Sequence, residues 1–345
     1  SILLPAGTPM KTASTHDGKS NGLAAGCGST ALSFAMHVQT VGTARERTWT
    51  DGSFSRLCRQ VVEAGAWVNS CASEPELGSP SRGGLPKTTA VRDGQGWRID
   101  GHKTFASLAP VLDYAIVPAA LAGEEGAIGR FLVPRAALRV VETWDAMGMR
   151  STGSHDLMLE GATVGDEALL YRETAHAPGP LEARAGAWFT LCFGAVYLGV
   201  ADAALEEAAR FALERVPTAL GRPLAQMEGI QRQIGEADLR LRGAGQWLGR
   251  LARRWDRSRS ESRQVLAPDV VALKLHLGEA VVAAVDAAAR VMGGASLLRG
   301  PMERCLRDVR AVLHHPPAAE QGLAYLGRLR LAAVEAALAR DRGEA

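Results

Sequence analysis

Three stretches in the first half of the chain decide the fold: CASEPELGSP at residues 71–80, GWRIDGHKTFAS at 96–107 and MGMRSTGSHDLMLE at 147–160. In the second stretch, apolar and polar residues alternate around Asp100-Gly101, a dipeptide that is typical of a β-hairpin turn. In the third, the alternation resumes after a cluster of glycine and serine. The three stretches therefore predict a compact β unit.

The sequence after Gly179-Pro180 is rich in Ala, Leu and Arg and poor in residues that favour strands. This composition predicts long helices. One segment places apolar residues alternately three and four apart, which is the pattern of a helix packed against near-parallel neighbours. We expect four helices that form a bundle, at residues 183–215, 227–255, 269–292 and 318–340.

Apolar stretches between glycines also indicate helices within residues 17–67. The predicted fold is therefore α+β and mainly α. It consists of a short N-terminal helical domain (1–67), a middle β-barrel domain (68–168) and a C-terminal four-helix bundle (181–345).

Length, charge and cysteine content exclude several classes of protein. The chain has 345 residues, of which 47% are hydrophobic, so it can bury a large core. Its net charge of +2 gives no reason to expect nucleic acid or a membrane surface as a partner. Five scattered cysteines without a CxxC pair predict reduced thiols and no metal site. With no apolar run as long as a membrane span and no signal peptide, we expect a cytoplasmic protein.

Together the motifs resemble the acyl-CoA dehydrogenase superfamily of flavoproteins. The middle β domain of that family carries a Thr-Glu-Pro-Gly-Ala-Gly-Ser type motif, a Lys-x-Trp-Ile-Thr motif and a Gly-Met-Arg-x-Ser-x-Ser motif. The matching stretches here are residues 73–79, 103–107 and 148–154, and Gly293-Gly294 and Arg307-Asp308 extend the resemblance over nearly the whole chain. The family has a longer stretch of leading helix before the β domain than this chain has, so we expect a truncated or incompletely represented N-terminal domain.

The resemblance implies a flavin site in the β domain. Ser107 stands where the family places the hydroxyl that contacts flavin N5, and Phe105 stands at the position of a tryptophan that packs on the flavin ring. Ser73, Gly78 and Ser79 would line the flavin and its phosphate. For Phe105, a place in the ordinary core is the alternative.

The resemblance also implies cofactor residues in the helical half. Arg215 matches the family arginine that reaches the cofactor pyrophosphate of a neighbouring subunit, although the motif is stretched here and Arg222 is a rival. Gly293 and Gly294 would let the adenine half of FAD approach the backbone; a simple helix stop is the alternative. FAD is therefore the expected cofactor, with FMN as the alternative, and the expected assembly is a homodimer or homotetramer.

The carboxylate that removes the α proton in an acyl-CoA dehydrogenase is missing from its usual positions. Pro316 stands about where the family commonly has this glutamate, and residues 188–189, the other known location, also lack a carboxylate. The His315-Pro316 pair resembles instead the flavin monooxygenases of the superfamily, in which a histidine assists oxygen chemistry. His315 and His37 are the candidate catalytic residues because an imidazole exchanges protons near neutral pH; a structural imidazole is the alternative for each.

Three functions remain open at this point. The first, which we favour, is a flavin-dependent oxidoreductase that acts on the CH-CH group of an acyl thioester such as an acyl-CoA and passes electrons to a partner protein. The second is a two-component monooxygenase that receives reduced flavin from a separate flavin reductase. The third is a flavin-binding relative without catalytic activity.

Overall fold

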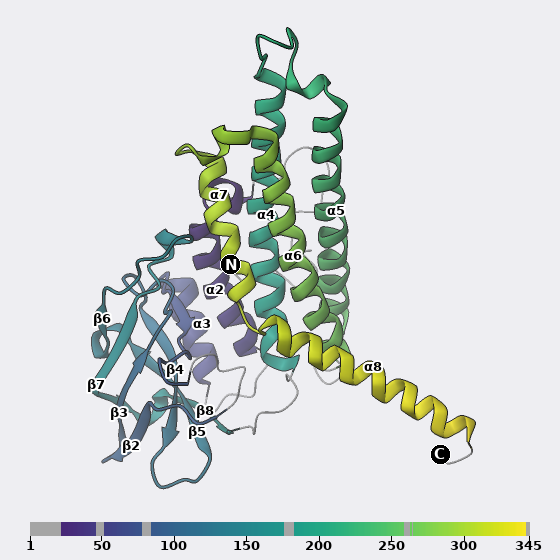
Figure 1. Cartoon of the computed structure of the whole chain (residues 1–345). Helices are drawn as coiled ribbons and strands as arrows, with labels where there is room; N and C mark the ends of the chain where they lie inside the picture. Colours follow the sequence, from purple (N-terminus) through teal and green to yellow (C-terminus); the bar gives the residue numbers. More distant parts are fainter. Residues whose placement is uncertain are drawn as a thin grey trace. The chain divides into compact units, whose positions relative to one another are not determined.

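The structure is a computed structural model, and it describes residues 22–45, 52–77, 84–175, 183–258, 263 and 265–342. The described residues fall into two compact units: Ser29–Gly179 form the first, and Pro180–Ala345 with residues 22–28 form the second. The order of N-terminal helices, a β-sheet and a C-terminal helical domain confirms the predicted fold class (Figure 1). The predicted domain bounds stay a prediction.

The first unit combines helices α2 (Gly28–Arg45) and α3 (Ser53–Glu63) with an eight-stranded sheet. Its strands pair in the order β6-β7-β3-β2-β4-β5-β8, with β1 beside β4. Strands β1 and β2 pair with β4 in parallel, and the other pairs are antiparallel. The strands are β1 (Val68–Ser70), β2 (Thr89–Asp93), β3 (Gly96–Lys103), β4 (Tyr114–Leu121), β5 (Ala127–Pro134), β6 (Arg139–Val141), β7 (Asp156–Gly165) and β8 (Leu169–Thr174).

The hairpin predicted at Asp100-Gly101 is wrong. Strand β3 continues through both residues, and only a shift in its pairing with β7 marks the position. The turn lies one Asp-Gly step earlier, where β2 ends at Asp93 and Gly94 has a φ of 59°. A left-handed backbone of this kind is what a tight hairpin requires, and Gly94 adopts it without strain.

The core of the first unit is formed by residues that alternate along the strands. Trp97 and Ile99 of β3 are buried, and the Trp97 ring meets Phe131 of β5 edge to face at 5.3 Å between centroids. Helix α3 adds Leu57 and Val61 to a second buried cluster of this unit. The period-two pattern seen in the sequence therefore results from one buried face of the strands.

The second unit consists mainly of four long helices, within one or two residues of the predicted ends in most cases. The short helix α7 was missed because its nine residues offer too few turns for a periodic signal. The short helix α1 (Leu23–Gly26) packs against α4, where Ala24 lies beside Gly199. The other helices are α4 (Ala183–Glu214), α5 (Glu228–Arg257), α6 (Ala267–Met292), α7 (Pro301–Val309) and α8 (Ala319–Asp341).

Helix α4 is the core helix of this bundle and packs against α5, α6 and α7. By length and composition, its segment Ala187–Glu214 could cross a membrane, so the expectation that no apolar run reaches that length is wrong. However, 67% of the most apolar window is buried inside the protein. Packing against three neighbouring helices therefore explains why this helix is apolar.

A buried ion pair holds the centre of the first unit together. The Nζ atom of Lys103, at the end of β3, donates to Glu74 at 2.5 Å and to the carbonyl oxygen of Pro118 at 2.7 Å. The same carboxylate accepts from the Lys87 backbone and from the Thr88 hydroxyl, both at 2.6 Å. Burial alone would raise the pKa of Glu74, but the hydrogen bonds from Lys103 and Thr88 outweigh it and lower the pKa.

Replacing Glu74 by Ala should destabilise the protein by about 3–5 kcal/mol, because the ammonium of Lys103 would remain buried without its counter-ion. Urea unfolding of the full chain measures this change. The matched control is Glu160→Ala, which breaks an exposed pair with Arg139 and should leave the urea midpoint nearly unchanged. Equal losses in the two variants would contradict the central role of the buried pair.

Candidate functional site

Two loops of the first unit combine the sequence motifs with unusual backbone geometry. Phe105 and Leu108 follow β3, Met149 precedes β7, and their φ angles are 55°, 70° and 53°. Among the residues that the structure describes, all non-glycine residues with positive φ lie in these two loops. Left-handed backbone is unfavourable for residues with a Cβ atom and collects at ligand-binding sites. The two loops are therefore the best candidate for a ligand clamp in this unit.

A chain of hydroxyl groups links the two loops. The Oγ atoms of Ser107 and Ser154 lie 2.9 Å apart, and Ser154 Oγ lies 2.7 Å from Oγ1 of Thr152. Thr152 in turn donates to the carbonyl oxygen of Met149 at 2.9 Å. Because each hydroxyl has one proton, this last bond fixes the direction of the others: Ser154 donates to Thr152, and Ser107 donates to Ser154. Ser107 can therefore offer a ligand only its lone pairs.

The chain of hydroxyls adds a direction to the expected site. The hydrogen bonds make the Ser107 hydroxyl an acceptor toward a ligand, and its contact with flavin N5 stays a prediction. The side chain of Asn69 fixes the same residue by donating to the Ser107 carbonyl oxygen at 3.0 Å. Asn69, Thr152 and Ser154 were not singled out from the sequence, although the two hydroxyls belong to the quoted motif.

Phe105 is 68% exposed, so the alternative that it belongs to the core is wrong. Its ring meets Trp144 edge to face, with centroids 6.0 Å apart. The loop of Trp144 is held by His155, whose Nδ1 accepts the backbone N–H groups of Thr143 and Trp144, both at 3.0 Å. Trp144 thus supports the Phe105 ring from its edge and leaves that ring accessible to a flat ligand.

Three other residues of this unit were predicted to line the flavin and its phosphate. Ser73 is half-buried, and its carbonyl oxygen accepts the backbone N–H of Thr104 at 2.9 Å, next to the strained loop. Gly78 and Ser79 lie outside the described residues. Their predicted roles at the flavin phosphate stay predictions.

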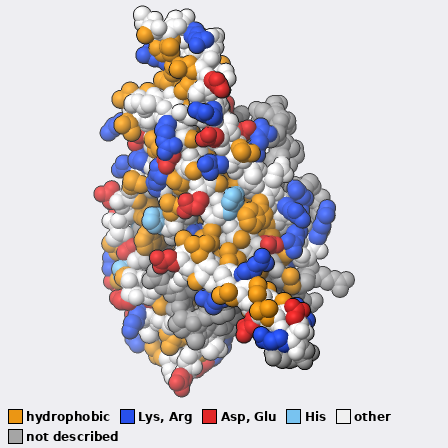
Figure 2. All heavy atoms as spheres, turned by 45° about the vertical axis from the view of Figure 1, so that its right-hand side comes forward, with side chains coloured by type: hydrophobic (Ala, Val, Ile, Leu, Met, Phe, Trp, Pro, Cys, Tyr) orange, Lys and Arg blue, Asp and Glu red, His pale blue; other side chains and the backbone are white. Residues whose placement is uncertain are grey.

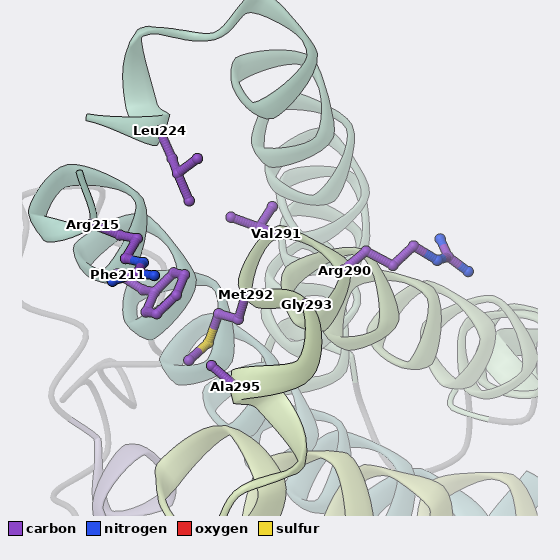
Figure 3. Close-up of a pocket in the computed structure, with 8 residues that line it drawn as sticks. All are labelled: Phe211, Arg215, Leu224, Arg290, Val291, Met292, Gly293 and Ala295. Atoms are coloured by element: carbon purple, nitrogen blue, oxygen red, sulfur yellow. The ribbon is translucent and has the colours of Figure 1, made fainter. Parts of the chain in front are cut away.

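In the second unit, an open pocket of about 490 Å³ brings together residues that are far apart in the sequence. Arg215 and Phe211 come from the end of α4, and Gly293 from the end of α6 (Figure 3). Arg222 does not line this pocket. Figure 3 shows that the Arg290 side chain extends away from Arg215. The structure therefore brings Arg215 and Gly293, two predicted cofactor residues, to one pocket.

Glycine has a conformational reason to stand at position 293. Gly293 ends α6 with a φ of 57°, so it does stop the helix. At both Gly293 and Gly294 an added Cβ would meet no atom within 4 Å, which leaves open space over the backbone. The helix stop and the room for a ligand are therefore compatible explanations.

His315 follows the 3-10 segment Arg310–His314 and lies in an aromatic cluster. Its Nε2 atom is 2.8 Å from the hydroxyl of Tyr197 on α4. The rings of Phe189, Phe193 and Tyr197 lie 5.5, 5.5 and 5.6 Å from the imidazole, centroid to centroid. Tyr197 was missed in the sequence because it precedes its partner by more than a hundred residues in an apolar helix.

Burial, followed by the charges of Lys274 and His314, lowers the pKa of His315 to about 4. The expectation that this imidazole titrates near neutral pH is therefore wrong, and the ring is uncharged at pH 7. Burial raises the pKa of Tyr197, so its hydroxyl stays protonated and can donate to Nε2. In this arrangement the proton of the uncharged imidazole is on Nδ1, so the pair can offer a ligand an N–H donor.

His37 has a structural partner in the first unit. It is 3% exposed on α2, and its Nδ1 accepts the backbone N–H of Val68 at 3.1 Å. One turn later on the same helix, Thr40 accepts the N–H of Ser70 at 3.2 Å. Burial lowers the pKa of His37. The two side chains thus attach α2 to strand β1, and this geometry favours the structural alternative for His37.

Comparison with known proteins agrees with this architecture. A family model described as "Acyl-CoA dehydrogenase, middle domain" matches residues 69–162, and "Acyl-CoA dehydrogenase, C-terminal domain" matches 191–319. YdbM of Bacillus subtilis (strain 168), which is named as an acyl-CoA dehydrogenase, is 37% identical over 299 residues, or 86% of this chain and 76% of YdbM. The chain belongs to the acyl-CoA dehydrogenase superfamily.

Other proteins that are similar to this chain carry different names. The amino sugar nitrososynthase DnmZ of Streptomyces peucetius is 30% identical over 332 residues, covering 87% of this chain and 75% of DnmZ. TdsC from Paenibacillus sp. A11-2, solved with FMN and indole, has a TM-score of 0.77 at 23% identity over 89% of this chain and 81% of TdsC. A glutaryl-CoA dehydrogenase from Mycobacterium smegmatis with FADH2 has a TM-score of 0.71 at 18% identity, over 86% and 73%. Structures of this superfamily fold thus hold FMN or FADH2.

For this superfamily member, stability should fall as the pH drops from about 6.5 to about 4. Between these two pH values, the His315 side chain is protonated in the unfolded chain but stays neutral in the folded protein, because folding lowers its pKa. The expected contribution is about 3 kcal/mol. Urea unfolding at pH 4, 5, 6 and 7 should show a smaller pH dependence for His315→Phe than for the wild type. Parallel curves for the two proteins would contradict the lowered pKa.

Proposed function

We propose that this chain is a flavin-dependent monooxygenase of the acyl-CoA dehydrogenase superfamily that takes up reduced flavin made by a separate reductase. The observation that carries this proposal is the direction of the hydroxyl chain, which leaves Ser107 as a hydrogen-bond acceptor. Reduced flavin carries an N–H at N5, whereas oxidised flavin has only a lone pair there. An acceptor at Ser107 thus favours the reduced form.

The residues of each unit fit a flavin. In the first unit, the exposed ring of Phe105, packed edge to face on Trp144, offers an aromatic face for the ring system, and Ser107 offers a polar contact at its edge. In the second unit, Arg215 offers paired N–H donors for a phosphate, and the backbone at Gly293 is open to close approach. When bound, flavin supplies redox chemistry: it exchanges electrons with a substrate or activates dioxygen.

His315 and Tyr197 supply the proton chemistry in this proposal. Because Nε2 accepts the hydrogen bond from the Tyr197 phenol, the neutral imidazole carries its proton on Nδ1 and can donate it to an oxygen atom of the substrate. The rings of Phe189 and Phe193 pack against the imidazole and hold it in place. In the overall reaction, dioxygen gives one oxygen atom to the substrate and one to water, and reduced flavin provides the two electrons.

Dehydrogenation of an acyl thioester is the second candidate, and the 37% identity to YdbM favours it. This reaction needs a base for the α proton, and His315 is the nearest equivalent because position 316 is proline. Anaerobic addition of an acyl-CoA to the flavin-loaded protein separates the candidates: bleaching of the flavin supports dehydrogenation. Oxygen-dependent product formation with reduced flavin supports the monooxygenase. A protein that does neither would be the non-catalytic flavin-binding relative.

Replacing Thr152 by Val should change the preference between the two forms of flavin. Without the Thr152 hydroxyl, Ser154 can donate to Ser107, and the proton of Ser107 becomes available to the ligand. The ratio of the dissociation constants for oxidised and reduced FMN should fall by roughly threefold to tenfold, as expected for one neutral hydrogen bond. Anaerobic fluorescence titration with each form measures this ratio.

The control for this experiment is Thr152→Ser, which keeps the hydroxyl and should keep the wild-type ratio. An unchanged ratio in Thr152→Val would contradict the assigned direction of the hydroxyl chain. If neither FMN nor FAD in any oxidation state binds to the wild type, the proposed function fails as a whole.

We also propose a homo-oligomer in which α8 contacts a second copy of the chain. Within the described residues only Gly322 and Tyr325 of this helix are buried, and α8 extends from the bundle in Figure 1. Leu331 and Leu338 are 71% and 51% exposed. Figure 2 shows hydrophobic side chains interspersed with charged ones of both signs on one face of the protein. An apolar helix of this length is marginal in water without packing, which favours a partner.

Light scattering should therefore give a dimer or tetramer for the wild type at micromolar concentration. The double variant Leu331→Gln, Leu338→Gln should give a smaller species because polar side chains weaken the apolar contact. Arg340→Gln, at an exposed position on the opposite face of the same helix, is the matched control and should keep the wild-type mass. A monomeric wild type that still binds flavin would contradict the oligomer.

A further inference from the structure

His155 connects two loops of the candidate site in the first unit. It directly follows the motif at residues 148–154 and is half-buried. Its backbone carbonyl oxygen accepts the N–H of Ala106, in the loop after β3, at 3.1 Å. Its side chain accepts the backbone N–H groups of Thr143 and Trp144, both at 3.0 Å. One residue thus holds the loop after β3 and the segment after β6.

The side chain of His155 takes the place of backbone pairing at this point. Strand β6 pairs with β7 as far as Val141 and Asp156, and residues 143 and 144 lie beyond the end of that ladder. Their N–H groups go to Nδ1 of the imidazole, which must be unprotonated because an acceptor has to offer a lone pair. The hydroxyl of Thr143 in turn accepts the backbone N–H of Asp156 at 3.1 Å. Two side chains therefore attach this segment to β7.

The attached segment carries Trp144, which meets both parts of the candidate site. Its ring meets Phe105 edge to face, with centroids 6.0 Å apart. Its indole N–H donates to the carbonyl oxygen of Met149 at 3.2 Å. The same carbonyl oxygen accepts the hydroxyl of Thr152, which fixes the direction of the hydroxyl chain. The aromatic contact and the hydroxyl chain thus share one carbonyl oxygen, and a shift of the indole would disturb both.

The Phe105 ring needs support from outside its own loop. It is 68% exposed, and its backbone has a φ of 55°. A ring that moves freely in solvent loses side-chain freedom when a ligand covers it, and this loss weakens binding. A ring that Trp144 already holds loses less. The attachment of Trp144 therefore bears directly on the affinity for a flat ligand.

We propose that His155 is a positioning residue of the candidate site. By accepting two N–H groups at Nδ1, it holds Trp144 against Phe105 and so prepares the Phe105 ring for a flat ligand. His155 acts through these two residues and contacts no ligand itself. That the ligand is flavin rests on the proposed function, whereas the attachment of the segment does not.

Amide hydrogen exchange of the full chain without flavin tests the attachment. In His155→Leu, the peptides that contain residues 143–144 should exchange roughly threefold to tenfold faster than in the wild type, because both amides lose their acceptor. His155→Asn should restore slow exchange, because the asparagine oxygen is as many bonds from the backbone as Nδ1 is. His155→Gln should not, because its oxygen lies one bond further out. The control His276→Leu removes an exposed histidine of α6 and should leave these peptides unchanged.

Titration with oxidised FMN tests the consequence for a ligand. The Kd for FMN should be roughly threefold to tenfold higher in His155→Leu and His155→Gln than in the wild type, and His155→Asn should keep the wild-type value. Amide exchange in β4 should be the same in all variants, which separates a local loss of order from a general loss of stability. If His155→Leu does not fold, the comparison of His155→Asn with His155→Gln still decides.

Wild-type exchange at residues 143–144 in His155→Leu, or no difference between His155→Asn and His155→Gln, would overturn the inference. Faster exchange combined with an unchanged Kd for FMN would overturn it as well. A wild type that binds neither FMN nor FAD would refute the proposed function, and the exchange experiment would still decide whether His155 holds the segment. Flavin binding and oxygenation by a wild type whose His155→Leu variant keeps slow exchange would refute the positioning role alone.

Discussion

The first unit depends on one buried ion pair, and its candidate site depends on that unit. Lys103 is the last residue of β3, and the strained Phe105 follows two residues later. Its partner Glu74 lies next to Ser73 and also accepts from Thr88, just before β2. The two opposite charges are buried away from water and must therefore pair with each other. This requirement fixes the positions of these segments more sharply than apolar packing would. The motif thus keeps its charged pair for geometry, even though a buried ion pair contributes little net stability.

The hydroxyl chain adds direction to this geometry. Position alone would let Ser107 act as donor or acceptor, and the bond from Thr152 to a backbone carbonyl removes that freedom. A buried threonine, two hydrogen bonds away from the surface of the loop, therefore determines whether the Ser107 hydroxyl donates or accepts. A search that is limited to the residues in contact with a ligand would miss such a residue.

The sequence predicted the helices and strands better than the contacts between residues that lie far apart in the chain. The ends of α5 and α6 could be found because an apolar stripe with a period of 3.6 repeats over many turns, and a glycine with positive φ ends α6. The hairpin was misplaced because two Asp-Gly steps lie seven residues apart and local sequence does not say which one bends. The pairs Tyr197–His315 and Asn69–Ser107 join distant segments, and their chemistry follows from the fold alone. The pKa of His315 could not be predicted either, since burial determines it.

The two units differ in what their basic residues contact. In the first unit the charge of Lys103 is neutralised by Glu74, so this network is complete without any ligand. In the second unit Arg215 lines an open pocket together with Gly293. A guanidinium offers paired N–H donors in a fixed geometry, which suits an anionic group that enters such a pocket. The buried lysine therefore serves the fold of the first unit, whereas the arginine of the second unit is placed to serve a ligand.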